Sequence, residues 1–197
     1  EGATVLHDLN LPVAEDMKNQ YTVIFDGGTL EHIFNFPIAI KNCMQMLRLG
    51  GHIISFTPAN NQCGHGFYQF SPELFFRIFS PKNGFDPTLI AMHGGDGSQG
   101  SADVYLVKDP DDVKNRIEFE SSKELSLIVV AKKIKETDLF SEFPQQSDYT
   151  SAWSAVKNQS TVSSPDNVSA FRTLYREKIP LKIRNRIYGL YHKIRYL

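Results

Sequence analysis

Cysteine is scarce in this chain of 197 residues, which contains only Cys43 and Cys63. Two cysteines cannot build a disulfide framework or a four-cysteine zinc site. Long apolar runs are missing as well, because none approaches the roughly 18 residues that a membrane-spanning helix requires. No signal-peptide pattern is visible. The apolar share of 41% and the charged share of 22% are typical of a soluble globular protein, and we expect a cytoplasmic one.

Positive charge is concentrated near the C-terminus. The net charge is −1, yet the segment from residue 172 onward holds eight cations and one acid, so the rest carries −8. Beyond Pro180 the cations mix with apolar residues in a pattern typical of a basic amphipathic helix. We expect this helical tail, residues 168–197, to dock on the parent sheet or a partner subunit, to lie on an anionic membrane surface through residues 181–197, or to grip an anionic polymer. Nucleic acid is unlikely, since no base-stacking motif or zinc pattern accompanies the charge.

One stretch, residues 21–58, has the pattern of a strand, a helix and a second strand. The run at 21–25 is apolar on both faces, as in a parallel strand covered by helices on each side. Pro37 suits a first helical turn. The expected helix ends at Gly50 and Gly51, and its apolar face consists of Ile40, Cys43, Met44 and Leu47. A strand at 52–56 completes the βαβ unit.

Further elements extend this unit into a domain. Ser71 and Pro72 predict the capped start of a second helix. Apolar runs predict strands at residues 3–7, 87–92, 103–107 and 125–131. We therefore expect three regions: an α/β domain over residues 1–135, a polar linker over 136–167, and the basic tail.

Polar residues gather where the two strands of the βαβ unit end. In open α/β sheets, ligands bind outside the carboxyl ends of the strands. We therefore expect the functional site at this edge of the sheet, built by residues that follow the first strand (Asp26, Gly27, Gly28, Thr29, Glu31 and His32) and the second (Thr57, Asn60 and Asn61).

The segment GTLEHIFNFPIAIKNCMQMLRLGGHIISFTP resembles the second half of class I S-adenosylmethionine-dependent methyltransferases. It has an LEH box after a strand, a helix with an LRxGG-like end, and a strand that ends at proline. The resemblance covers residues 3–133. It implies a Rossmann-like, mostly parallel sheet flanked by helices, with an antiparallel terminal strand pair, and S-adenosylmethionine as cofactor. The Gly-rich cofactor turn of the family is absent, so we expect either a fragment that lacks the N-terminal strands or a fold without half of its cofactor site.

The resemblance also implies roles for single residues on the cofactor side. Asp8 and Leu9 would hold the adenine, and Asp26, Gly27 and Gly28 would flank the methionine end of the cofactor. For Asp8 a simpler interpretation stays open, since Asp and Asn are common at the beginning of a turn.

On the acceptor side, the passage that contains His65 lines the acceptor pocket in relatives. His65 is the candidate general base, because histidine titrates near neutrality, with Tyr68 as a positioning partner. A purely structural histidine that ties the loop is the alternative. Glu31, His32, Asn60 and Asn61 are the remaining candidates for binding the acceptor, although an acid near a helix N-terminus also has a structural explanation. No metal is expected, since the sequence shows no convincing ligand cluster.

Two functions remain open at this point. One is methyl transfer to a small-molecule or sugar acceptor. The other is a degenerate methyltransferase fold that serves as a non-catalytic binding or scaffolding module, with the basic tail on a partner or membrane surface. A homo-oligomer is a further expectation, because a sheet edge left without neighbours invites a partner strand.

Overall fold

The computed structural model describes residues 2–94, 103–150 and 153. The chain divides into two compact units, Glu1–Ser151 and Ala152–Leu197. Two predicted regions lie outside the described residues. They are the basic tail, which includes residues 181–197, and the part of the linker beyond residue 150, except Trp153. Within the described part, no helix combines the length and the apolarity needed to cross a membrane.

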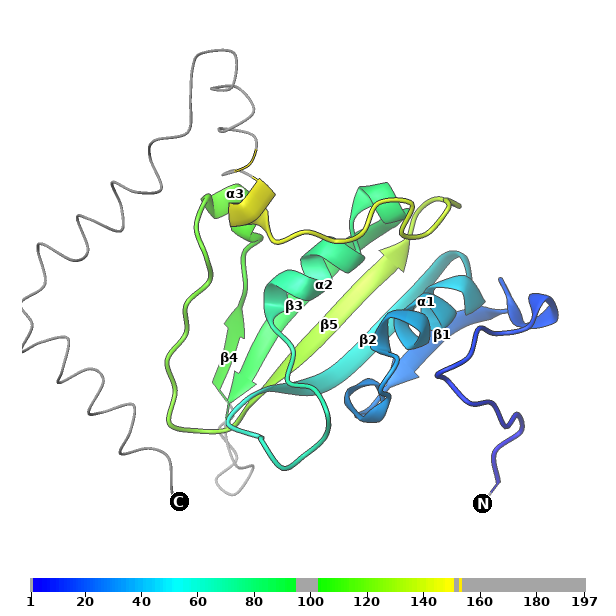
Figure 1. The fold of residues 1–197 in the computed structure, drawn as a ribbon, viewed down its shortest axis with the longest axis horizontal. Coiled ribbons are helices and arrows are strands. Elements are labelled where there is room, and N and C mark those ends of the chain that lie inside the picture. The colour runs from blue at the N-terminus through cyan, green and yellow to red at the C-terminus, as the bar shows by residue number, and fades with distance from the viewer. Residues whose placement is uncertain (1, 95–102, 151–152, 154–197) are drawn as a thin grey trace, which may run out of the picture. The chain divides into compact units, whose positions relative to one another are not determined.

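The first unit is built on one mixed sheet of five strands in the order β1-β2-β5-β3-β4 (Figure 1). The strands are β1 (Tyr21–Asp26), β2 (Leu47–Asn60), β3 (Phe85–Gly94), β4 (Asp103–Leu106) and β5 (Leu125–Lys133). β1 and β2 are parallel, whereas β5 runs antiparallel to both of its neighbours and β4 runs antiparallel to β3. The predicted α/β class is therefore confirmed. A mostly parallel sheet is not, because one of the four described strand pairs is parallel.

Two helices cover one face of the sheet. α1 (Phe36–Met46) packs against β2, and α2 (Pro72–Ile78) packs against β3; Figure 1 draws both in front of the strands. The shorter helices are η1 (Glu15–Met17), η2 (Leu30–His32), η3 (Pro81–Asn83) and α3 (Pro110–Val113). The predicted cap of α2 is present, since the Ser71 side chain accepts a hydrogen bond from the Leu74 N–H.

Two boundary predictions are wrong. Residues 3–7 form no strand: Val5 and Leu6 are exposed, and none of the described strands pairs with this segment. Gly50 and Gly51 do not end the first helix, which stops at Met46; they lie inside β2. Gly51 is needed there because a Cβ atom would lie 2.9 Å from the Arg48 carbonyl oxygen and 3.0 Å from that of Thr22.

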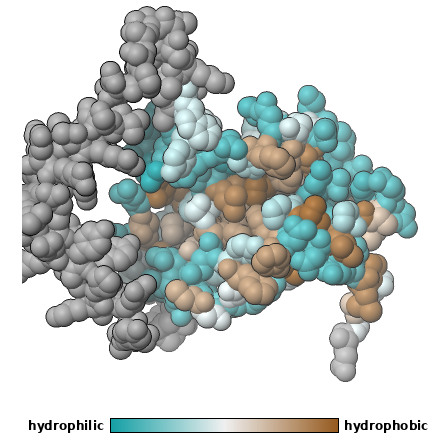
Figure 2. Space-filling model, in the orientation of Figure 1, coloured by the Kyte–Doolittle hydropathy of each residue, from teal (hydrophilic) through white to brown (hydrophobic). Residues whose placement is uncertain are grey.

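The core lies between the helices and the sheet. Alternate residues of β5 point toward the helices and are buried, as the period of two along a strand requires. A row of rings runs from the start of α2 to β3, with centroids 5.6, 6.1 and 5.5 Å apart between successive members, Phe70, Phe75, Phe79 and Phe85. On the helix-covered side, hydrophilic side chains surround patches of apolar surface (Figure 2).

The opposite face of the sheet contains an apolar row of residues and is only partly covered by the described part of the chain. Residues paired in register point to the same face, so Phe25, Ile54, Val130 and Leu89 form one row across β1, β2, β5 and β3. Several residues of this face are exposed: Val23, Phe25, Phe56, Val104 and Leu106. The prediction that helices cover β1 on both sides is therefore not met by the described residues.

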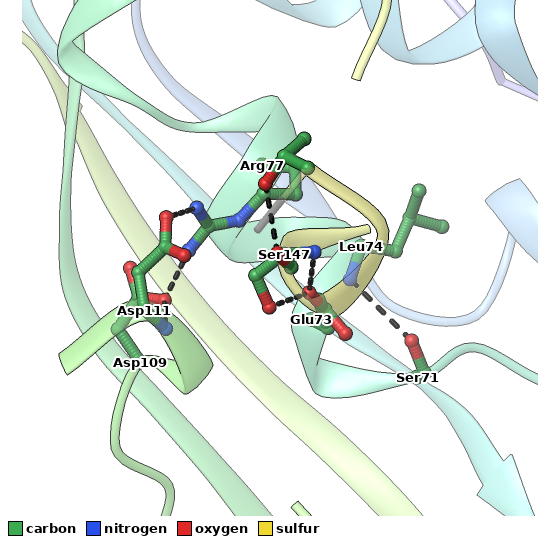
Figure 3. A network of polar contacts seen from close by, with 8 residues as sticks. Ser71, Glu73, Leu74, Arg77, Asp109, Asp111 and Ser147 are labelled. Carbon is green, nitrogen blue, oxygen red and sulfur yellow. Dashed lines mark hydrogen bonds and ion pairs between the residues drawn. The ribbon is translucent and has the colours of Figure 1, made fainter. Parts of the chain in front are cut away.

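Charged contacts fix α2 to its neighbours (Figure 3). Arg77 makes ion pairs with Asp109 and Asp111 at the start of α3. On the other side, the Glu73 carboxylate accepts hydrogen bonds from the backbone N–H and the hydroxyl of Ser147. These contacts join segments more than thirty residues apart in sequence and hold the covering layer together.

Candidate functional site

The site begins at the turn that follows β1. Asp26 is almost fully buried, and its Oδ1 accepts hydrogen bonds from the N–H groups of Thr29 (2.9 Å) and Leu30 (3.3 Å). Its Oδ2 accepts a hydrogen bond of 2.6 Å from the Ser55 hydroxyl on β2. Both carboxylate oxygens are thus engaged within the protein. Asp26 fixes the turn and thereby the position of η2.

Glu31 lies in η2 and is completely buried, with no exposed surface. Its Oε1 lies 3.2 Å from Nε2 of His65 and 3.8 Å from Nε2 of His32. Its Oε2 is also buried, and no described group donates a hydrogen bond to it. Because a buried carboxylate is costly unless it is paired, the two imidazoles are the main partners of Glu31 in this structure.

The loop that carries His65 is fastened to the backbone of η2. The Glu31 carbonyl oxygen accepts hydrogen bonds from the N–H groups of Phe67 (2.9 Å) and Tyr68 (3.2 Å). A Cβ atom on Gly66 would lie 3.0 Å from that same oxygen, so any larger residue would crowd the approach. Neither Gly64 nor Gly66 has a positive φ. Close packing at Gly66, and not unusual backbone freedom around His65, explains this glycine.

The two histidines face outward from the buried carboxylate. Their ring centroids are 5.3 Å apart, and their side chains are 48% (His32) and 50% (His65) exposed. One ligand atom from each of Glu31, His32 and His65 lies within 4.8 Å of the other two. The fold thus brings together three possible ligands that the sequence pattern did not group, whereas the expectation that no metal binds stays a prediction. The available signal was the position of the three residues after the carboxyl ends of the neighbouring parallel strands β1 and β2.

Tyr68 packs beside this cluster. Its hydroxyl donates a hydrogen bond of 2.6 Å to the Phe34 carbonyl oxygen, and its ring stacks on Phe70. Its oxygen is therefore tied to the backbone, and Tyr68 joins the loop to the segment after η2.

Asn60 and Asn61 make different contacts from the Glu31 cluster. The Asn61 amide donates hydrogen bonds to the carbonyl oxygens of Ser121 (2.7 Å) and Lys123 (2.8 Å), and its φ is 59°. Asn61 therefore fixes a turn beside β5. Asn60 instead lines a cavity of about 230 Å³, together with Gln69, Phe70, Met92 and Phe119.

Asp8 and Leu9 lie in the irregular N-terminal segment. The Asp8 carboxylate is exposed, and hydrogen bonds from the backbone and side chain of Asn10 lower its pKa. The Leu9 carbonyl oxygen accepts a hydrogen bond from the buried Asn42 on α1. Among the described residues, neither of the two contacts the Glu31 cluster. Asp8 has the Asx-turn geometry that its simpler interpretation predicts.

The predicted site residues thus separate into groups. Asp26 and Gly28 support Glu31, which meets His32 and His65; a Cβ atom on Gly28 (φ 98°) would lie 3.2 Å from Glu31 Oε1. Gly27 lies in the same turn. Asp8, Leu9, Asn60 and Asn61 contact other parts of the fold. The sequence analysis did not foresee that Asp26 is fully used by hydrogen bonds.

No protein-family model matches the chain, and no curated protein matches its sequence. Function has to be argued from the geometry of the cluster. That geometry offers one buried carboxylate and two solvent-facing imidazoles, a set able to move a proton or to hold a cation.

Proposed function

We propose that this chain carries the acceptor side of the active site of an S-adenosylmethionine-dependent methyltransferase that acts on a small molecule or a sugar. The observation that carries the proposal is the Glu31–His65 contact at the carboxyl ends of β1 and β2. The βαβ unit of β1, α1 and β2 is the part of the chain where the sequence resembles this enzyme class. A ligand at that edge of an α/β sheet is the usual arrangement.

The rest of the sheet is compatible with the same proposal. β5 inserts between β2 and β3 and is antiparallel to both, as the antiparallel end of the family's sheet implies. β1 lies at one edge of the described sheet. In the proposal this edge is where further parallel strands of a Rossmann-like sheet pair.

The described residues fit the cofactor in part. Gly27 and Gly28 follow β1 and have no side chains, and Gly28 adopts a positive φ of 98° that favours glycine. This turn would therefore leave room for the methionine end of the cofactor. When bound, S-adenosylmethionine supplies an electrophilic methyl group. Asp26 shapes this turn and does not face the cofactor, because both of its oxygens are engaged.

His65 has the geometry of a general base. Its Nε2 is oriented by the buried Glu31 at 3.2 Å, while half of its side chain stays open to an acceptor. In the proposed reaction His65 would accept the proton of the acceptor hydroxyl, while the bound donor would supply the methyl group with cleavage of its methyl–sulfur bond and leave as S-adenosylhomocysteine. His32 would contact the acceptor beside it. Orientation and proton removal are the contributions expected of such a site.

Calorimetric titration of the complete protein with S-adenosylmethionine and S-adenosylhomocysteine tests this proposal. We expect saturable heat and a higher melting temperature with both compounds. Gly28→Val should weaken binding at least about tenfold, on the order of 1.4 kcal/mol, because it fills the turn. Gly64→Val, at a position where an added Cβ meets nothing within 4 Å, is the matched control. Absence of heat and of a thermal shift with either compound would reject the proposal.

A non-catalytic module is the second candidate. It is favoured by the hydrogen bonds that engage Asp8, Asp26 and Asn61 within the protein. The same titration separates the two functions. A folded protein that binds neither compound supports the non-catalytic module. A His65→Gln variant that still binds S-adenosylmethionine but no longer transfers the methyl group supports the enzyme.

A further inference from the structure

We propose that Glu31, His32 and His65 form a binding site for a divalent transition-metal ion. The inference goes beyond methyl transfer and does not depend on it. One carboxylate and two imidazoles, with ligand atoms all within 4.8 Å of one another, make a two-histidine, one-carboxylate set. Imidazole favours ions such as Zn²⁺, Fe²⁺ and Co²⁺, and a facial set of this kind leaves other coordination positions open.

The strongest argument is the state of the Glu31 carboxylate. It has no exposed surface, and its Oε2 is buried without a hydrogen-bond donor among the described residues. The only ion-pair partners that the described residues provide are the two histidines, and no lysine or arginine pairs with it. A buried carboxylate requires compensation by a positive charge or by full hydrogen bonding. A divalent ion held between Glu31 Oε1 and the two imidazoles would supply positive charge beside this carboxylate.

The distances suit a cation after a small movement. Donor atoms lie about 2.0–2.2 Å from a bound zinc ion, which puts ligand atoms about 3 Å or slightly more from one another. Glu31 Oε1 already lies 3.2 Å from His65 Nε2 and 3.8 Å from His32 Nε2. Both rings are about half exposed, and both already have Nε2 within 4 Å of Glu31 Oε1. Only the His32 ring has to approach Glu31 appreciably.

The surroundings hold the carboxylate in place before any ion arrives. Asp26 fixes the start of η2, and the Phe67 and Tyr68 N–H groups fix the Glu31 carbonyl. Gly66 lets the histidine loop pack directly on Glu31. A preorganised set of ligands loses less freedom on binding, which favours affinity.

The exposure of the rings indicates what the ion would do. Its open positions would face solvent, where a water molecule or an acceptor oxygen can bind. Under the methyl-transfer proposal, on which this one consequence rests, the ion would lower the pKa of an acceptor hydroxyl that it contacts, and His65 would then act as a ligand instead of the base.

Metal titration of chelator-treated protein tests the site. We would use the complete chain with Cys63→Ser, because Cys63 is an exposed thiol in the same loop as His65 and could bind the probe. Co²⁺ reports its coordination through visible absorption bands, and Zn²⁺ affinity follows from competition with a chromophoric chelator. We expect one saturable equivalent, and at least about a tenfold loss of affinity with each of Glu31→Gln, His32→Gln and His65→Gln.

His93→Gln is the matched control, since His93 is a half-buried histidine on β3 that lies outside the cluster. It should leave affinity and the cobalt spectrum unchanged. Circular dichroism of the apo variants separates loss of a ligand from loss of fold, and the half-exposed His32 and His65 are the variants expected to fold normally. No saturable binding, or binding that survives all three ligand variants, would overturn the site. The titration contains no methyl donor, so its failure and that of the methyl-transfer proposal are read independently.

Discussion

Gly84 is the residue at which the backbone tolerates least change. Its φ is 74°, and an added Cβ would lie only 2.2 Å from the Lys135 carbonyl oxygen. We expect Gly84→Ala to lower the free energy of unfolding by about 2–5 kcal/mol, combining left-handed strain with a clash against backbone. Gly64→Ala, with open space around it, should change it by less than about 0.5 kcal/mol. Urea denaturation of both variants checks the prediction, and equal effects would contradict it.

The two cysteines should differ sharply in reactivity. Burial, and then the nearby Asp26 charge, raises the pKa of Cys43 to about 12, whereas Cys63 is exposed. The thiolate is the reactive form, so Cys43 should be inert at pH 8. We expect a disulfide reagent to label one thiol of the native protein quickly and the second only in denaturant. Rapid labelling of Cys43 in the native Cys63→Ser variant would contradict the burial of Cys43.

The same thiol gives a stability prediction with a defined sign. Unfolded, Cys43 titrates near its usual pKa of 9.0, and folded it titrates near 12. Between these values the unfolded chain has lost a proton that the folded chain keeps, so stability falls as pH rises. We expect Cys43→Ala to flatten the decline in unfolding free energy between about pH 9 and pH 11. If the unfolding free energy of Cys43→Ala declines as steeply as that of the parent protein over this pH range, groups other than Cys43 cause the decline and the prediction is wrong.

Helix α1 organises the N-terminal segment through one buried amide. Asn42 Oδ1 accepts the Val13 N–H at 3.0 Å, and its Nδ2 donates to the carbonyl oxygens of Leu11 (2.8 Å) and Leu9 (3.3 Å). We expect Asn42→Ala to cost about 1–3 kcal/mol, since it leaves these backbone groups unpaired. Hydrogen exchange should accelerate at residues 9–13. Lys41→Ala, on the same helix but half-buried, is the control and should affect neither measurement.

This amide also shows where sequence analysis reached its limit. The strand, helix and strand of residues 21–58 were predictable because each depends on local periodicity. The strand expected at residues 3–7 was wrong because a strand requires a partner far away in sequence, and here the neighbouring residues bind Asn42 instead. Gly50 and Gly51 look like a helix end, as glycine often is, but both lie inside β2, where Gly51 permits close packing and Gly50 adopts a positive φ of 82°.

The candidate site was predictable to a similar extent. Glu31 and His65 were both expected at the acceptor side of the site, Glu31 because it follows the first strand and His65 because of the family resemblance. Their direct contact across 34 positions of sequence has no local signature. The same holds for Asp26, whose residue type suggests a ligand-facing acid, while its hydrogen bonds to Thr29 and Ser55 are set by tertiary packing. Burial and pairing of a carboxylate are properties of the fold.

At the scale of the first unit, two helices cover one face of the sheet, and the described residues leave the other face partly exposed. The row that contains Phe25 is apolar across β1, β2, β5 and β3, yet Phe25 is 72% exposed, and Leu106 on β4 is 75% exposed. Apolar surface of this kind is more extensive than single scattered residues, which need no explanation. The open face is therefore a testable property of the complete chain.

Substitutions on this face should cost little. Phe25→Ser and Leu106→Ser are each expected to change the free energy of unfolding by less than about 1 kcal/mol, because both side chains already contact water in the folded state. Phe79→Ala, in the ring row on the covered side, should cost about 3–5 kcal/mol. Urea denaturation of the complete protein compares the three. A loss of 2 kcal/mol or more, on the order of a buried side chain, at Phe25 or Leu106 would show that this face is covered and that the apolar rows belong to a second core.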